Sequence, residues 1–90
     1  MKKTIWKFPF EVTDEIKIRM PKGAEILTVE AQGSSPCIWA LVDPDASMEV
    51  VTFRVYGTGH PVETMNIEEH VGTFQLEGGA FVGHLFKAAT

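Results

Sequence analysis

The run from Pro36 to Asp43 (PCIWALVD) is apolar at every position between its two end residues. Neither alternating face of the run carries a row of polar residues. A short apolar run bounded by Pro and by Asp-Pro is typical of a strand that is buried on both faces. Burial on both faces requires one layer of structure above the strand and one below it. We therefore predict an all-β fold: a small antiparallel β-sandwich of about seven strands, with closure toward a barrel as the alternative.

The rest of the chain divides into short alternating runs separated by turn residues, as sandwich sequences do. Strands are predicted at residues 4–10, 15–20, 25–32, 36–43, 50–56, 70–77 and 80–87. The third of these is predicted to turn one face toward the core, made of Leu27, Val29 and Ala31. The Gly78-Gly79 pair predicts a two-residue hairpin turn, and residues 62–69 are predicted to form a long loop.

Length and composition limit the classes of partner. Ninety residues with 44% hydrophobic content suit one core, so we predict a single domain over residues 1–90. The net charge of −4 disfavours nucleic acid, because phosphate binding requires a basic surface. Six basic residues near the amino terminus are interpreted as a solvated face: Lys2, Lys3, Lys7, Lys17, Arg19 and Lys22.

The single cysteine, Cys37, lies inside the apolar run and cannot form an intramolecular disulfide. A lone buried thiol favours a reducing compartment, so we expect a cytoplasmic location. We expect no signal peptide and no membrane partner, because the apolar residues near the amino terminus are interrupted by charges and proline.

Several longer motifs resemble a family of small uncharacterised proteins of about 90 residues from bacteriophages and prophage-bearing bacteria. They are Met20–Val29, Trp39–Pro44, Phe53–Pro61, His70–Gln75 and Phe81–Phe86. The resemblance covers residues 4–87 and implies a compact phage-type accessory protein that acts in the cytoplasm of a bacterial host cell, but it implies no activity. That family often has Trp before the His of the last strand, where this chain has Gly83, so a role for the aromatic side chain does not carry over.

Residue clusters that carry chemistry are weak in this sequence. The three histidines, His60, His70 and His84, lie in separate segments and lack a His-x-His spacing, so we predict no metal site and no cofactor. The Gly57–His60 stretch could cradle phosphate, but Pro61 removes a donor, and a glycine-rich bend is favoured. No serine lies in a nucleophile elbow. We therefore predict that the protein is not an enzyme.

A binding surface remains as the leading hypothesis. Arg54 and Tyr56 share the outward face of one predicted strand and precede a glycine-rich loop. Arginine and tyrosine are frequent at binding hot spots. We predict a binding site for a host or phage protein, or for a small ligand, made of Arg54, Tyr56, Thr58 and His60.

Three alternatives remain open. One is a soluble scavenger of a nucleotide-like host signal, and another is a minor virion component. The third concerns oligomerisation, because the last strand is apolar on both sides. That strand either is covered by the second sheet or forms a homo-oligomer contact, through the residues Phe81, Val82, Leu85 and Phe86.

Overall fold

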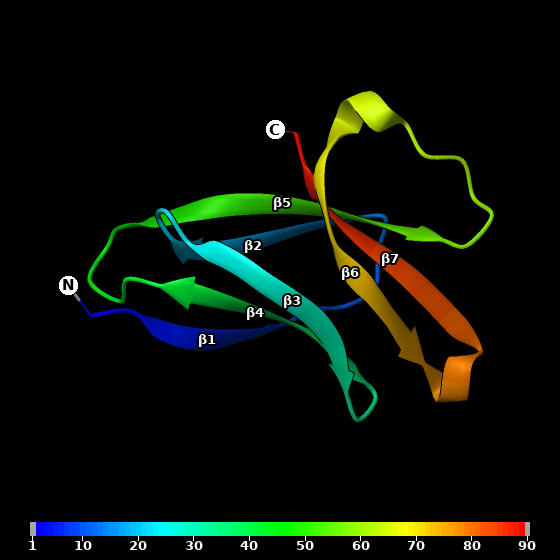
Figure 1. Cartoon of the computed structure of the whole chain (residues 1–90), viewed down its shortest axis with the longest axis horizontal. Helices are drawn as coiled ribbons and strands as arrows, with labels where there is room; N and C mark the ends of the chain where they lie inside the picture. Colours follow the sequence, from blue (N-terminus) through cyan, green and yellow to red (C-terminus); the bar gives the residue numbers. More distant parts are fainter. Residues whose placement is uncertain (1, 90) are drawn as a thin grey trace.

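A computed structural model describes residues 2–89 as two antiparallel sheets that face each other (Figure 1). The three-stranded sheet has the order β1-β4-β3 and the four-stranded sheet the order β2-β5-β7-β6. The strands are β1 (Thr4–Pro9), β2 (Glu15–Pro21), β3 (Glu25–Gln32), β4 (Ser35–Val42), β5 (Met48–Gly57), β6 (Ile67–Leu76) and β7 (Phe81–Ala88). Two short 3₁₀ turns flank β6, at Thr64–Asn66 and Glu77–Gly79. The predicted all-β sandwich is confirmed, and the barrel alternative is wrong because the two sheets stay separate.

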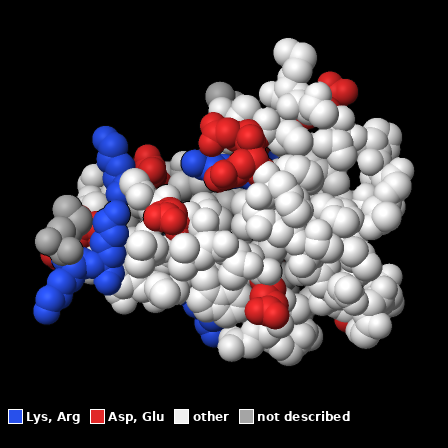
Figure 2. All heavy atoms as spheres, viewed as in Figure 1, with Lys and Arg blue, Asp and Glu red and all other residues white. Residues whose placement is uncertain are grey.

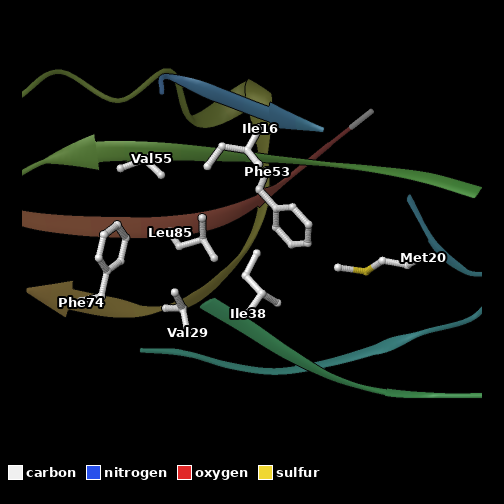
Figure 3. Packing of buried hydrophobic residues seen from close by; sticks show 8 residues of the cluster. All are labelled: Ile16, Met20, Val29, Ile38, Phe53, Val55, Phe74 and Leu85. Carbon is white, nitrogen blue, oxygen red and sulfur yellow. The ribbon is translucent and has the colours of Figure 1, made fainter. Parts of the chain in front are cut away.

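The core fills the space between the sheets. Phe53 of β5, Leu85 of β7 and Ile38 of β4 are each fully buried. Figure 3 shows these side chains pointing toward one another, with Met20 near one end of the cluster and Phe74 near the other. Fully burying an aliphatic or aromatic side chain of this size stabilises a fold by about 1.5–3 kcal/mol. β7 lies inside its sheet between β5 and β6. Its Leu85 side chain is fully buried in the core, whereas Val82 and Phe86 on the opposite face are partly exposed.

The sheets approach each other most closely where β3 packs against β6 (Figure 1). A glycine makes this approach possible. A Cβ atom at Gly72 would lie 3.0 Å from Cγ1 of Val29, closer than ordinary carbon contacts allow. A residue without a side chain at position 72 therefore lets the backbone of β6 lie directly over the buried Val29.

The inward face predicted for β3 is wrong at Leu27. The pairing of β3 with β4 shifts register between Ile26 and Thr28, which marks a β-bulge. The bulge directs both Ile26 and Val29 to the core, and Leu27 is 42% exposed. Strict alternation from the sequence could not reveal this extra residue.

The prediction that β4 is covered on both faces holds on one face only. Ile38, Ala40 and Val42 are fully buried against the other sheet. The opposite face is half open: Trp39 and Leu41 are partly exposed, since no further layer of residues 2–89 lies outside the three-stranded sheet.

Cys37 also lies on this outer face but is 1% exposed. The Lys7 ammonium donates to Oε1 of Gln32 at 2.7 Å. Lys7 lies on β1 and Gln32 on β3, so the bond spans β4. In the strand register, the diagonal between them passes over Cys37. This polar strap crosses the open face at the position of the buried thiol.

The β6–β7 connection also differs from the prediction. Leu76 pairs with Phe81, the register that a turn centred on Gly78-Gly79 requires, but Glu77 and Ala80 are outside the ladder, so the turn has four residues with the predicted glycine pair at its centre. Glu77, Gly78 and Gly79 all have positive φ angles of 53°, 66° and 96°. Because β6 already begins at Ile67, the predicted 62–69 loop is shorter at its carboxyl end and includes the 3₁₀ turn Thr64–Asn66.

The basic residues near the amino terminus do not form one surface. Lys7 lies on the outer face of the three-stranded sheet, whereas Lys17 and Arg19 lie on β2 in the other sheet. In the view of Figure 2 the basic side chains are most prominent at the end of the molecule near the N terminus. None of the helices described in residues 2–89 is long and apolar enough to cross a membrane.

Candidate functional site

A pocket of about 410 Å³ lies at the carboxyl end of β5. The pairing of β2 with β5 ends at Glu15 and Arg54, so residues 55–57 of β5 run on beyond β2. The segment before β2 and the loop after β5 enclose this end of the strand. Residues from three parts of the chain line the pocket, among them Asp14, Arg54, Tyr56, His60, Glu63 and Phe81.

Backbone hydrogen bonds hold the pocket walls. The Val55 amide donates to the Asp14 carbonyl at 3.2 Å and fixes the segment before β2 against β5. The His60 amide donates to the Gly57 carbonyl at 3.1 Å and closes a turn as the chain leaves β5. Gly59 has a φ of 88° within that turn, a conformation that favours glycine. The loop thus folds back toward the strand it follows.

Gly57 gives the His60 ring its position. A Cβ atom at residue 57 would lie 3.1 Å from Cε1 of His60. The imidazole therefore rests on the bare backbone of the glycine. In this way the glycine-rich stretch acts as a platform for one pocket side chain.

The charges of the pocket lining are unequal. The Arg54 guanidinium donates to Oε2 of Glu15 at 3.2 Å, so a carboxylate already balances its positive charge. Asp14 and Glu63 also line the pocket, and neither forms an ion pair with another residue in the range 2–89. The lining therefore carries an excess of negative charge.

Aromatic side chains continue from the pocket across the outer face of the four-stranded sheet. The Tyr56 and Phe86 rings meet edge to face, with centroids 5.8 Å apart. On the other side of Phe86 lies the His70 ring, at 5.1 Å. Edge-to-face contacts of this kind hold rings in a fixed orientation. Tyr56 is therefore supported from behind by Phe86.

His84 occupies the next row of this face, between Tyr56 and Thr73 in the strand register. Its Nε2 lies 2.7 Å from Oγ1 of Thr58, and its Nδ1 lies 2.9 Å from Oγ1 of Thr73. A neutral imidazole has one donor and one acceptor nitrogen, so one hydroxyl donates to the ring and the other accepts from it. His84 thereby ties the loop after β5 to β6.

The chain matches over residues 1–90 a family described as a domain of unknown function (DUF7352). The chain belongs to this family. No curated protein and no solved structure matches it. The description of this family assigns no activity to its members.

The structure brings together three of the four predicted site residues of the DUF7352 chain. Arg54, Tyr56 and His60 line one pocket, whereas Thr58 turns to the outer face and bonds to His84. Among residues 2–89, no group of three or more His, Cys, Asp and Glu side chains is placed to hold a metal ion.

Asp14 and Glu63 line the pocket although the sequence pattern does not single them out. Asp14 belongs to a short predicted turn, and Glu63 to a predicted loop without clear periodicity. Neither residue is part of a motif that signals binding. Their contribution depends on where the Asp14–Val55 backbone bond and the path of the 57–66 loop place them, and no local pattern encodes this.

Proposed function

We propose that this DUF7352 protein is a non-enzymatic binding module and that its site is the pocket at the carboxyl end of β5. The observation that carries the proposal is the pocket itself, with a ring-supported tyrosine in its wall. Its volume of about 410 Å³ falls in the range of small-molecule sites, about 300–1,000 Å³. Loops at the end of a rigid sandwich are also where binding residues usually lie.

The concave shape favours a small ligand over a broad protein surface. Apolar atoms of Val55, Pro61 and Phe81 contribute to the lining together with polar groups of Arg54 and His60. Such a mixture is typical of pockets that bury an apolar body and orient it with a few hydrogen bonds. A host or phage protein would have to insert a single side chain here to use the same site.

The resemblance to phage and prophage proteins supports an accessory role for the protein in the cytoplasm of a bacterial host. The nucleotide-scavenger alternative is less favoured, since phosphate groups would meet the uncompensated carboxylates of Asp14 and Glu63. A minor virion component needs no pocket of this composition.

Native mass spectrometry of the protein purified from producing cells tests the proposal, followed by identification of compounds released on heating. We expect a bound compound that is lost in Tyr56→Ala, because Tyr56 is one of the residues that line the pocket. Val50→Ala is the matched control, since Val50 lies on the same strand, is 59% exposed and is outside the pocket. Equal retention of the compound in both variants would refute the pocket as the site.

A further inference from the structure

We infer that the pocket takes a small organic cation, a molecule with an ammonium or guanidinium group attached to an apolar body. This inference rests on the proposed function and names its ligand class. It combines the cavity, its apolar wall and the distribution of charge around it. Each of these comes from a different part of the chain.

The apolar wall comes from the sheet and fixes where the ligand body lies. Val55 is 7% exposed and belongs to the core, and Phe81 packs against that core while also lining the pocket. Tyr56 adds an aromatic ring that Phe86 holds from the outer face. An apolar body of ligand can therefore contact the core side of the pocket without any rearrangement of the sheet.

The charge distribution selects the head group. Arg54 is the cationic side chain that would attract an anion, and Glu15 already neutralises it at 3.2 Å. Asp14 precedes β2 and Glu63 precedes the Thr64–Asn66 turn, so the two carboxylates come from different walls. With both residues in the lining, their charges attract a cation in the pocket and repel an anion.

Aromatic side chains add to this preference. The face of a tyrosine or phenylalanine ring attracts a cation through its quadrupole. Tyr56 and Phe81 are both in the lining, and neither ring gains from an anionic ligand. Charge and ring chemistry therefore favour the same ligand class.

Three probes of similar shape test the inference on the full chain: 2-phenylethylamine, 2-phenylethanol and 3-phenylpropionate. Titrations followed by ¹⁵N–¹H NMR report binding at the amides of residues 54–63. We expect 2-phenylethylamine to bind about twofold to thirtyfold more tightly than 2-phenylethanol, the range for two solvent-accessible charge pairs. We expect 3-phenylpropionate to bind more weakly than 2-phenylethanol, and added salt to reduce both differences.

Charge variants separate the pocket from the net charge of the protein. Asp14→Asn/Glu63→Gln should remove the preference for the amine while leaving 2-phenylethanol affinity unchanged. Glu25→Gln/Glu30→Gln is the control, because it makes the same change in net charge on β3. Loss of the preference in this control would overturn the inference, since overall charge would then explain it.

The outcomes also distinguish the inference from the proposed function. If all three probes bind equally, or 3-phenylpropionate binds best, the inference of a cationic ligand is wrong, but the pocket is still supported as the binding site. If no probe shifts the amides of residues 54–63 and Tyr56→Ala retains the compound found by native mass spectrometry, both the pocket and the ligand class are wrong.

Discussion

Replacing Gly83 with alanine should destabilise the protein by about 1–2 kcal/mol. A Cβ atom at position 83 would lie 2.7 Å from Cζ of Phe74 and 2.9 Å from Cε2 of Phe81. Carbon atoms in contact normally lie about 3.5–4.0 Å apart, so both rings would have to retreat by about 1 Å. Phe74 is 2% exposed and has little room to move.

Two effects of opposite sign set this magnitude. Overpacking a core costs about 1–3 kcal/mol. Removing a glycine from a strand recovers about 0.5–1 kcal/mol of backbone entropy. Because the contacts involve a buried ring, we expect the steric term to be larger, and the melting temperature to fall by about 5–15 °C.

Thermal and urea unfolding followed by tryptophan fluorescence measure the effect. Gly57→Ala is the matched control, because Gly57 also lies in a strand and its new Cβ would meet the exposed His60 ring at 3.1 Å. An exposed ring can swing aside, so this variant should stay within about 0.5 kcal/mol of the unmodified protein. Phe74→Leu should lower the free energy of unfolding less in the Gly83→Ala variant than in the unmodified protein, because the smaller side chain relieves the contact with the new Cβ atom. Equal stability of the two alanine variants would show that the contacts at Gly83 do not limit packing.

Two further predictions concern the loop and the thiol. Thr58→Val removes the 2.7 Å bond to His84. This variant should lower the free energy of unfolding by about 0.5–1.5 kcal/mol, and it should speed amide hydrogen exchange in residues 57–66. Thr73→Val removes the bond to the other ring nitrogen but keeps the Thr58 bond to His84 on β7, so it should speed exchange in that loop less than Thr58→Val does. Equal acceleration in both variants would show that the Thr58–His84 bond does not anchor the loop by itself. Cys37 is 1% exposed, so a thiol reagent should label it no faster than the protein unfolds; immediate labelling of the native protein would show that the Lys7–Gln32 strap does not cover it.

The strands were predictable from the sequence because their alternation and their turn residues agree. The predicted range 25–32 coincides with β3, which pairs with β4 in the antiparallel manner of the predicted sandwich. The exposure of Leu27 was not predictable, since a bulge depends on the register between two strands. A pattern within a single strand carries no information about its partner's register.

The last hairpin shows the same limit. Gly78-Gly79 is a strong signal for a two-residue turn. The structure keeps the register of that turn, since Leu76 pairs with Phe81 and the Ala80 amide donates to the Glu77 carbonyl across the glycine pair. The glycine pair thus predicts the register of the hairpin, whereas the positive φ of Glu77, next to the end of the ladder, was not predictable from the pattern.

The candidate site was predictable in part. Arg54, Tyr56 and His60 lie close together in the chain, and their residue types by themselves are typical of binding sites. Asp14 joins them only through its backbone bond to Val55, 41 positions later in the sequence. The charge of the pocket, and with it the preferred ligand class, therefore depends on a tertiary contact.

The packing at Gly83 and the shape of the pocket are coupled through Phe81. This ring lies over Gly83 on β7 and also forms part of the pocket wall. Any side chain at residue 83 has to displace Phe81, so it alters the apolar surface that a ligand body would contact. Gly83→Ala should therefore change probe binding as well as stability.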